Sequence, residues 1–298
     1  MNARISQYIC RTLHCDAEAI QQWARVPQGH TNEVFSFVVQ GQRYLFRAPG
    51  RGSAQIIDRW HEYEAMQWAA ALGLDLSLVA CEPARGWKIS RYFAASFAGT
   101  PAQAEARSLA LIRRLHGEGT RQRLGWDFAF FPRAVALQAL VPTGCFAAYT
   151  GFEALCQAVR ELQTYWQQDG VPWEMCHNDC CAQNILLGDQ ADYLIDWEYA
   201  GDNDPAADIA TFIIGEPRSA AAVDRILGCY YQRSLTAAEW RHNYGGIALS
   251  AYFYFVWGVY EENIGNEVGG LTPIWYHYLQ EYTAKALALY RTERGYHL

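Results

Sequence analysis

The sequence predicts an α+β fold with a small N-terminal lobe, built from an antiparallel sheet and one helix, and a larger, mainly helical C-terminal lobe. Short apolar runs separated by turns fill the first third of the chain, as in Phe35–Val39 and Arg43–Arg47 on either side of Gln40-Gly41-Gln42. Longer segments with apolar residues at helical spacing dominate the remainder. Between them, residues 94–101 are rich in Ala, Ser, Gly, Thr and Pro, which is typical of a linker. We therefore expect domains over residues 1–95 and 96–298.

The N-terminal domain is expected to begin with a helical lead-in over residues 1–25, followed by a turn over residues 26–32. After the first two strands, a helix is predicted from Ala54 to Leu72, because Gly73 is a typical helix stop. Two further short strands are predicted at residues 76–80 and 87–93.

The C-terminal domain shows several helical stripes of apolar residues. One of these ends at Gly170 and Pro172, and a later one begins with the capping box formed by Thr236 and Glu239. The last helix is expected to start at Thr272-Pro273. The apolar run 247–260 is shorter than the roughly 20 residues that cross a bilayer, so a buried helix is expected there and no membrane insertion.

The basic residues are almost all arginine, since Lys88 and Lys285 are the only lysines among 24 Lys and Arg residues. The sequence contains no Gly-Lys dipeptide, which excludes a P-loop, and no basic stripe, which argues against a nucleic-acid partner. Nine cysteines without CxxC spacing, together with the lack of a signal peptide, favour the reducing cytoplasm.

Acidic residues are concentrated between Arg160 and Arg218, where twelve Asp and Glu residues occur without a lysine or arginine among them. So many carboxylates repel one another unless cations compensate them. The segment therefore predicts divalent metal ions and a cationic substrate.

The strongest motif is H-x-D-x-x-x-x-N, formed by His177, Asp179 and Asn184. Protein-kinase catalytic loops have this spacing, with the Asp as catalytic base and the Asn on a magnesium ion, and a later Asp binds the metals. Here Asp196 follows at the end of a second short apolar run. The runs 185–187 and 193–195 flank Gly188-Asp189-Gln190, which predicts a hairpin with Asn184 at one end and Asp196 at the other.

Arg47 ends the second predicted strand, where a kinase carries its phosphate-binding lysine, and its planar fork suits phosphate oxygens. Glu62 and Glu64 lie in the following helix as possible partners, and we favour Glu62. The turn that contains Gly29 and Asn32 is expected to contact the nucleotide phosphates through backbone N–H groups.

With these motifs in place, the chain resembles the choline/ethanolamine kinases, within the aminoglycoside phosphotransferase group of the protein-kinase-like fold. The resemblance is carried by HNDCCAQNILL, IDWEYAGDNDPAADIA, FRAPG and YFYFVWGVYEEN, and it spans about residues 29–289. It implies ATP and Mg²⁺ as cofactors, with Asp179 as base, Asn184 and Asp196 as metal ligands and Arg47 as a phosphate contact. In such a fold Asp208 is expected to brace the catalytic loop.

The resemblance also implies that aromatic side chains and an acid enclose a trimethylammonium group. The positions that match are Tyr199, Trp257, Tyr260 and Tyr278, with Glu216 as the acid. A quaternary ammonium ion donates no N–H hydrogen bond, so ring faces and a carboxylate are what can hold it. The implied substrate is a small cationic amino-alcohol, choline first, with ethanolamine, thiamine or an aminoglycoside as alternatives. A non-catalytic nucleotide-binding protein of the same fold is the alternative of another class, and the sequence leaves the oligomeric state open.

Overall fold

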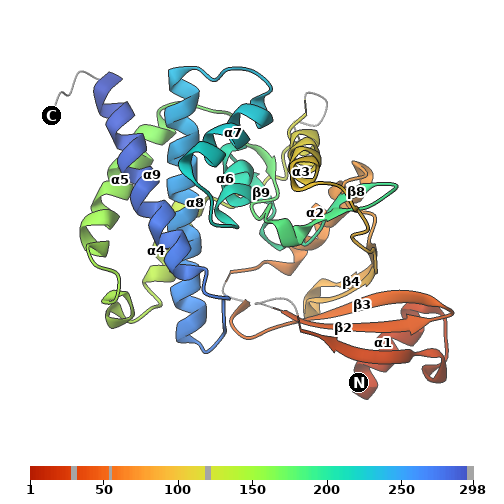
Figure 1. The fold of residues 1–298 in the computed structure, drawn as a ribbon. Helices are drawn as coiled ribbons and strands as arrows, with labels where there is room; N and C mark the ends of the chain where they lie inside the picture. The colour runs from red at the N-terminus through yellow and green to blue at the C-terminus, as the bar shows by residue number, and fades with distance from the viewer. Residues whose placement is uncertain (28–31, 54–55, 118–121, 294–298) are drawn as a thin grey trace. The chain divides into compact units, whose positions relative to one another are not determined.

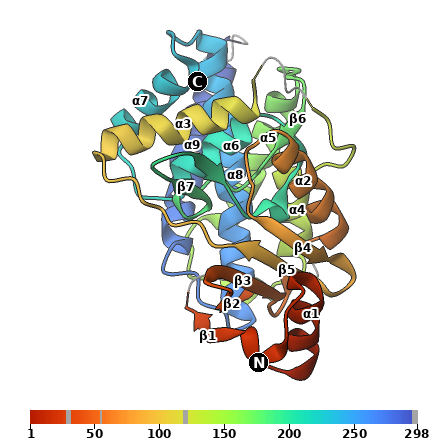
Figure 2. The ribbon, with the colours of Figure 1, turned by 90° about the vertical axis from the view of Figure 1, so that its right-hand side faces the viewer.

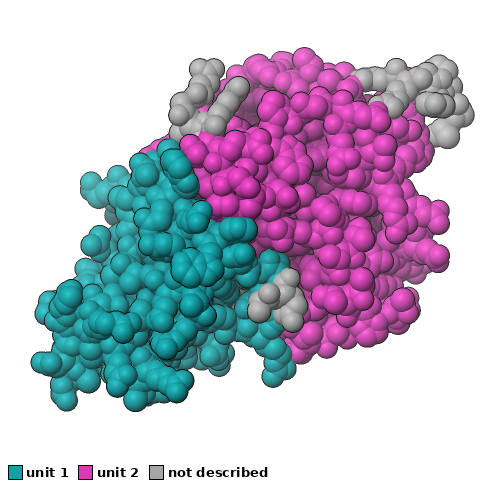
Figure 3. Space-filling view, turned by 180° about the vertical axis from the view of Figure 1, so that it is seen from behind, with its two compact units in different colours: residues 1–98, 186–198 teal, residues 99–185, 199–298 magenta. Residues whose placement is uncertain are grey.

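The computed structural model describes residues 1–27, 32–53, 56–117 and 122–293. The chain divides into two compact units, which Figure 3 shows in two colours. Unit 1 contains residues 1–98 and 186–198, and unit 2 contains residues 99–185 and 199–298. The segment 186–198 thus belongs with the N-terminal unit, although a contiguous division at residue 96 assigns it to the C-terminal domain.

Unit 1 is built on a five-stranded antiparallel sheet with the order β1-β2-β3-β5-β4, which confirms the predicted α+β class (Figure 1). Its elements are α1 (Ala3–Leu13), β1 (Gln21–Val26), β2 (Asn32–Val39), β3 (Gln42–Pro49), α2 (Arg59–Ala71), β4 (Leu78–Glu82), β5 (Trp87–Arg91), β7 (Ile185–Leu187) and β8 (Asp192–Leu194).

The hairpin between β2 and β3 follows from its two-residue turn. Gln40 and Gly41 have φ angles of 50° and 78°, and Val39 pairs with Gln42 directly behind them. Positive φ at both central positions is the type I′ geometry, whose twist matches that of antiparallel strands. Only glycine adopts this backbone without cost, which explains Gly41 at the second position.

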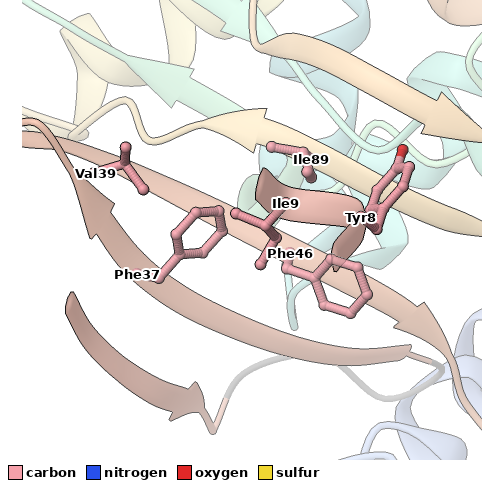
Figure 4. Close-up of a cluster of buried hydrophobic side chains, with 6 residues drawn as sticks. All are labelled: Tyr8, Ile9, Phe37, Val39, Phe46 and Ile89. Atoms are coloured by element: carbon pink, nitrogen blue, oxygen red, sulfur yellow. The ribbon is translucent and has the colours of Figure 1, made fainter. Parts of the chain in front are cut away.

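One face of the sheet is covered by α1 (Figure 2). Figure 4 shows the buried side chains that fill this layer, and they are Tyr8 and Ile9 from the helix with Phe37, Val39, Phe46 and Ile89 from the strands. Residues two apart on a strand share a face, so the pair Phe37 and Val39 points into this layer together. Burial of these side chains is what holds the helix on the sheet.

Two sequence predictions for unit 1 are wrong in their details. Part of the segment expected to be a helical lead-in, Gln21–Val26, is the edge strand β1, because its backbone pairs with β2. The helix predicted from Ala54 begins only at Arg59, because Asp58 is its N-cap. The carboxylate of Asp58 accepts hydrogen bonds from the backbone N–H groups of Trp60 and His61, and so it fixes the helix start.

The predicted hairpin around Asp189 is confirmed, since β7 and β8 form a two-stranded sheet. Contacts within unit 1 explain why it belongs there. The backbone N–H of Leu194 donates to the carbonyl of Leu74 at 2.9 Å, and that of Phe97 donates to the carbonyl of Leu187 at 3.1 Å. The rings of Phe93 and Tyr193 are stacked with centroids 4.8 Å apart.

Unit 2 is mainly helical. Its elements are α3 (Pro101–Leu115), α4 (Phe130–Gln138), α5 (Phe152–Gln167), β6 (Glu174–Cys176), β9 (Gly201–Asn203), α6 (Ala206–Ile214), α7 (Ala220–Tyr231), α8 (Ala237–Asn263) and α9 (Thr272–Glu293). The short strands β6 and β9 pair antiparallel and flank the segment that carries Asp179.

Helix α8 is the centre of unit 2 and contacts α4, α5, α6 and α9; it runs beside α9 in Figure 1. The predicted capping box starts it, with Thr236 and Glu239 bonded reciprocally. The apolar run 247–260 is buried within it, as expected from the sequence. In the described part of the chain, none of the helices combines the length and apolar character needed to cross a membrane.

An ion-pair network ties the start of α8 to the loops around it. Both ring nitrogens of His242 lie within hydrogen-bond distance of carboxylates, Asp169 Oδ2 at 2.8 Å and Asp204 Oδ2 at 2.9 Å. Burial alone lowers the pKa of His242, but these two hydrogen bonds and charges outweigh it and raise the pKa to about 9. His242 is therefore a buried imidazolium at neutral pH.

This network predicts a pH-dependent stability. A histidine whose folded pKa is raised stabilises the fold fully below its unfolded pKa of about 6.5, and this contribution is lost as the pH rises through the folded pKa of about 9. We expect the free energy of unfolding of the wild type, measured by urea titration, to fall by up to about 3 kcal/mol relative to that of His242→Gln between pH 6 and pH 9.5. His277→Gln, at an exposed site on α9, is the control. A difference between wild type and His242→Gln that does not change with pH would contradict the assignment.

Candidate active site

The loop that carries the H-x-D-x-x-x-x-N motif is held in place by hydrogen bonds to the buried carboxylate of Asp208. Its Oδ2 accepts from the backbone N–H of His177 at 3.0 Å, and its Oδ1 accepts from that of Asn178 at 2.5 Å. The expected bracing role of Asp208 is thus confirmed. Asn178 has a φ of 63°, a left-handed conformation that asparagine tolerates better than most residues and that these bonds hold in place.

Asp208 keeps its charge although it is fully buried. Burial raises the pKa of this carboxyl, but the hydrogen bond to His116 and the nearby imidazole groups lower it below its usual value. His116 Nε2 lies 2.9 Å from Asp208 Oδ2, and its Nδ1 lies 2.8 Å from the hydroxyl of Tyr230. A charged carboxylate accepts stronger hydrogen bonds than a neutral one, which suits a loop that must stay rigid.

Asp179 and Asn184, both predicted as catalytic, are in direct contact. The Nδ2 of Asn184 donates to Asp179 Oδ2 at 2.7 Å and to the Asp179 carbonyl at 2.9 Å. Asn184 ends a single 3₁₀ turn, Ala182–Asn184, which brings its side chain back over the loop. Because Nδ2 faces Asp179, the amide oxygen Oδ1 is the atom of Asn184 that can bind a cation.

Tyr254 is a site residue that the sequence analysis did not identify. Its hydroxyl donates to Asp179 Oδ1 at 2.7 Å and to the carbonyl of Asn178 at 3.0 Å. Burial and the nearby Asp179 charge raise the pKa of Tyr254 well above its usual value, so it remains a donor. Its position three residues before Trp257 in the aromatic run of α8 was the available signal, since residues three apart share a helix face.

Tyr254, which binds Asp179, is one of three aromatic rings that pack together. Tyr254, Trp257 and Trp275 have pairwise ring centroids 6.1, 5.5 and 5.8 Å apart and are tilted or edge-to-face. We call these residues the ring cluster. Within the described chain the Nε1 of Trp257 is buried without a hydrogen-bond partner. Trp275 comes from α9 and was not predicted, because only the packing of α9 against α8 reveals it.

Tyr199 and Tyr278, which were also predicted to bind substrate, pack against or bond to other parts of the protein. Tyr199 stacks on Phe128 at 4.8 Å and meets Phe253 edge-on at 6.0 Å, which is a core environment. The hydroxyl of Tyr278 donates to the carbonyl of Glu216 at 2.8 Å and accepts from the backbone N–H of Arg218. Hydrogen bonds therefore occupy the polar end of Tyr278.

Glu216 and Tyr260 differ in their surroundings. The Glu216 side chain is half-exposed and forms an ion pair with Arg218 at 3.2 Å, so its charge is already compensated. Tyr260 is buried in α8, three residues after Trp257. Its place on the helix leaves it on the same side as the ring cluster.

In unit 1, Arg47 and Glu62 form the ion pair expected from the sequence. The guanidinium of Arg47 binds both carboxylate oxygens of Glu62, with Nη2 and Oε2 2.8 Å apart. Both side chains are buried. Burial raises the pKa of Glu62, but the charges of Arg47 and Lys88 outweigh it and hold the pKa far below the usual range.

Around this pair lies a charge network that the sequence analysis identified only in part. Lys88 pairs opposite Arg47 across β3 and β5, and its Nζ lies 3.4 Å from both Glu62 Oε1 and Asp196 Oδ1. Lys88 was noted only as a rare lysine. Its position beside Arg47 follows from strand register, which a single sequence does not give.

Glu198 closes the network on the other side. Its Oε2 accepts from Arg59 Nη1 at 3.0 Å and from Asn32 Nδ2 at 2.8 Å, and it lies 3.6 Å from Arg47 Nη1. Asn32 was predicted to contact the nucleotide, and its side chain donates a hydrogen bond to Glu198. Burial and the Asp196 charge raise the pKa of Glu198, with the two arginines opposing them. Gly29, the other turn residue of that prediction, lies outside the described residues.

A divalent cation fits the donor atoms around Asp196. Carboxylate oxygens of Glu62, Asp196 and Glu198 lie within 4.8 Å of one another. Glu62 and Glu198 are bonded to arginines, whereas the Asp196 side chain is 36% exposed and is contacted by Lys88 at 3.4 Å and by Arg47 at 3.7 Å. Carboxylate oxygens are among the ligands that Mg²⁺ prefers.

The family of the chain follows from comparison with known proteins. The model of the Phosphotransferase enzyme family matches residues 22–241, which is more than half of the chain. The chain belongs to this family. The predicted membership is therefore confirmed, and the H-x-D-x-x-x-x-N motif lies inside the matched region.

Two curated relatives of this phosphotransferase are proteins named LicA from Haemophilus influenzae. They are 27% and 29% identical over 227 and 215 residues, which is 68% and 67% of this chain. The matches span 60% and 76% of the relatives' own lengths, so the chain covers about three fifths of the first of them.

Solved structures show the same fold. A structure of LicA in complex with AMP has a TM-score of 0.78 at 21% identity, with 95% of this chain and 98% of that chain covered. The structure of choline kinase LicA from Streptococcus pneumoniae has a TM-score of 0.77 at the same identity and coverage. The predicted kinase-like α+β fold of this phosphotransferase is confirmed.

The buried Arg47–Glu62 pair generates a stability prediction for the phosphotransferase. Removing one member of a buried pair leaves the other charge uncompensated, which typically costs about 3–5 kcal/mol. Since Lys88 and Arg59 also face Glu62, we expect Glu62→Ala to lower the free energy of unfolding by about that amount. Glu64→Ala, on the exposed face of the same helix, should change it by less than about 0.5 kcal/mol. Urea titrations of both variants provide the measurement, and equal effects would contradict the pairing.

Proposed function

We propose that this phosphotransferase is an ATP-dependent choline kinase, which transfers the γ-phosphoryl group of ATP to the hydroxyl of choline and releases phosphocholine and ADP. The observation that carries the proposal is the contact between Tyr254 and Asp179. It joins a carboxylate that can accept a substrate hydroxyl to a cluster of aromatic faces that can bind an organic cation. The names of the relatives, LicA and choline kinase, agree with this chemistry.

Asp179 is the proposed base. Its Oδ1 accepts a hydrogen bond from Tyr254 and its Oδ2 accepts one from Asn184, and these bonds fix the direction of the carboxylate. A carboxylate oxygen has a further lone pair, with which Asp179 accepts the hydrogen bond of the choline hydroxyl. The hydroxyl oxygen forms the new bond to the γ-phosphorus, the bond to the ADP oxygen breaks, and the hydroxyl proton passes to Asp179.

The cation of the substrate is assigned to the ring cluster with Tyr260 beside it. Trp257 and Trp275 present aromatic rings within contact distance of Tyr254, and each good face contributes about 0.5–2 kcal/mol to cation binding. Tyr199, Tyr278 and Glu216 are weaker candidates, because packing or hydrogen bonds already engage them in this structure.

We assign nucleotide binding to the N-terminal part, residues 1–95, and catalysis and substrate binding to residues 96–298. Arg47 and Lys88 are the cations of unit 1 that suit phosphate oxygens; Arg47 is the more deeply buried and is held by Glu62. When bound, Mg²⁺ ions neutralise the negative charge of the transferring phosphoryl group. Asp196 and Asn184 are the residues that would bind them. The free cysteines of the described chain suit a cytoplasmic location, which we propose as well.

Ethanolamine, thiamine and aminoglycosides are the alternative acceptors. An aminoglycoside requires several carboxylates in an open groove, whereas the surroundings of Asp179 are aromatic. Ethanolamine requires hydrogen-bond acceptors for its ammonium group, which ring faces supply poorly. The non-catalytic alternative does not account for the fixed orientation of Asp179.

A substrate panel tests the proposal directly. ADP release, measured with ATP and Mg²⁺ against choline, ethanolamine, thiamine and kanamycin, should give the highest kcat/KM with choline. Asp179→Asn should lower kcat by about 100- to 10,000-fold, because the base is lost while the fold is retained. Asp189→Asn, the same change at an exposed hairpin position, is the matched control and should have wild-type activity. A higher value with kanamycin would support the aminoglycoside alternative, and no release with any acceptor would support the non-catalytic one.

The ring cluster predicts the selectivity. Trp257→Ala should weaken choline binding by about 1–2 kcal/mol and ethanolamine binding by less, so the kcat/KM ratio of choline to ethanolamine should fall. Trp257→Phe retains a ring, so its kcat/KM ratio of choline to ethanolamine should lie between those of the wild type and Trp257→Ala. Trp240→Ala removes a partly buried tryptophan from the other end of the same helix and serves as the control. An unchanged ratio in a folded Trp257→Ala variant would assign Trp257 to the core.

A further inference from the structure

A cavity lies in unit 2, among residues to which no role has been assigned. Its volume is about 220 Å³, and it is bounded by residues of α4, α5, α6 and α8 and by the segments before α4 and β6. None of the residues proposed for catalysis, metal binding or substrate binding is among those that line it. The cavity therefore needs an explanation of its own.

Two of the lining residues carry a buried polar atom that has no hydrogen-bond partner among the described residues. Ser250 is completely buried in the middle of α8, and its hydroxyl has no partner in the described chain. A serine inside a helix ordinarily donates to the carbonyl four residues earlier. The amide oxygen Oε1 of Gln163 is also buried and without a partner among the described residues. Each such group costs about 1–3 kcal/mol if it stays unsatisfied, so a molecule that bonds to them gains this free energy on binding.

The walls of the cavity are aromatic and already fixed in place. Trp166 is stacked on His242 with centroids 4.9 Å apart and an interplanar angle of 9°, and its Nε1 donates to the carbonyl of His242 at 3.0 Å. Phe130 is stacked on Phe253 at 5.1 Å. Phe131 and Trp173 complete the aromatic lining. Fixed ring walls favour a flat apolar group, because little side-chain freedom is lost on binding.

The charged residues of the cavity lining determine which sign of charge a ligand can carry. Asp127 is exposed and lines the cavity, and among the described lining residues there is no lysine, arginine or histidine. An anionic ligand would therefore meet the Asp127 carboxylate and the Gln163 amide oxygen, whereas the neighbouring cation, Arg133, lies outside the lining and donates to the Asp127 carbonyl at 3.0 Å. A protonated amine instead pairs with Asp127 and supplies N–H donors.

We propose that this cavity is a binding site for a small arylalkylammonium ion, whose ring lies between the aromatic walls and whose ammonium group pairs with Asp127. A hydroxyl on the ring satisfies the buried oxygens of Ser250 and Gln163. Tyramine, with about ten non-hydrogen atoms, is the probe of matching size and chemistry. The site is independent of the proposed choline kinase activity.

The test measures binding of four related compounds by isothermal titration calorimetry at saturating choline, which blocks the active site. Tyramine should bind most tightly. 2-Phenylethylamine, which lacks the hydroxyl, should bind about 5- to 100-fold more weakly, because the hydrogen bonds to Ser250 and Gln163 are both lost. Tyrosol, the uncharged analogue, should bind more weakly than tyramine, and 4-hydroxyphenylacetate, the anion, should not bind.

Variants locate the site. The side chain of Asp127 accepts a hydrogen bond from the backbone N–H of Ala129 at 3.3 Å, and Asp127→Asn keeps an oxygen for this bond. The variant should therefore weaken tyramine binding about tenfold through loss of charge alone. Glu153→Gln, an exposed acid on α5 outside the lining, is the matched control and should have no effect. Ser250→Ala should weaken tyramine binding while leaving the melting temperature unchanged or higher, because the unpaired hydroxyl is removed. Trp257→Ala should leave tyramine binding intact.

Three results would overturn the proposal. Absence of tyramine binding to the wild type would mean that the cavity holds water only. Equal effects of Asp127→Asn and Glu153→Gln would show that Asp127 makes no contact with the ligand. Loss of tyramine binding in Trp257→Ala, with binding retained in Ser250→Ala, would place the compound in the active site instead.

Discussion

The buried carboxylate of Asp208 is the interaction on which the catalytic loop of unit 2 depends. It accepts hydrogen bonds from two consecutive backbone N–H groups, those of His177 and Asn178, directly before Asp179. Asn178 adopts a left-handed backbone conformation there. Because this carboxylate is buried, charged and bonded to His116, its hydrogen bonds hold the loop more firmly than hydrogen bonds to solvent would. The direction of Asp179 is then completed by side chains from two other elements, Asn184 on the 3₁₀ turn and Tyr254 on α8.

Unit 1 depends on a second balance of buried charge. Arg47, Arg59 and Lys88 face Glu62, Asp196 and Glu198, so three cations meet three carboxylates within one network. Adding a divalent cation at Asp196 would place it close to Lys88, and the two would repel each other. Phosphate groups between them remove this repulsion. For the metal and nucleotide binding proposed above, this charge balance would favour joint binding over binding of the metal alone.

Sequence reasoning succeeded where the chemistry is local in the chain. The spacing of Asp179 and Asn184 marked both as site residues within one short loop, although their mutual hydrogen bond was not predicted, and the hairpin before Asp196 followed from two apolar runs and a turn. The choice of Glu62 over Glu64 was also correct, since Glu62 is the buried one of the pair. These predictions required only short-range geometry.

The features that were missed depend on contacts between distant segments. The place of Lys88 beside Arg47 depends on the register of β3 and β5, and the place of Trp275 depends on how α9 packs against α8. Composition could not separate ring-cluster residues from core residues either, because 14% of the chain is aromatic. Tyr199, which matches the family pattern, packs in the core with Phe128, whereas Tyr254, which was not considered, binds Asp179.

Glycines on α8 explain why one helix can serve several roles at once. Ser250, Tyr254 and Trp257 follow one another at intervals of four and three residues, so one stripe of α8 contributes to the cavity beside α4 and α5, to the contact with Asp179 and to the ring cluster. Such a helix must be packed on every side. A Cβ atom on Gly245 would come within 2.7 Å of the Trp166 ring, and one on Gly258 would come within 3.0 Å of the Trp275 ring. The same Cβ would come within 2.7 Å of Thr272 Oγ1, so any larger residue at 258 would force Thr272 or Trp275 to shift. The Trp-Gly pair at 257–258 is thus a packing requirement of the ring cluster, because the tryptophan supplies one ring and the glycine makes room for the next.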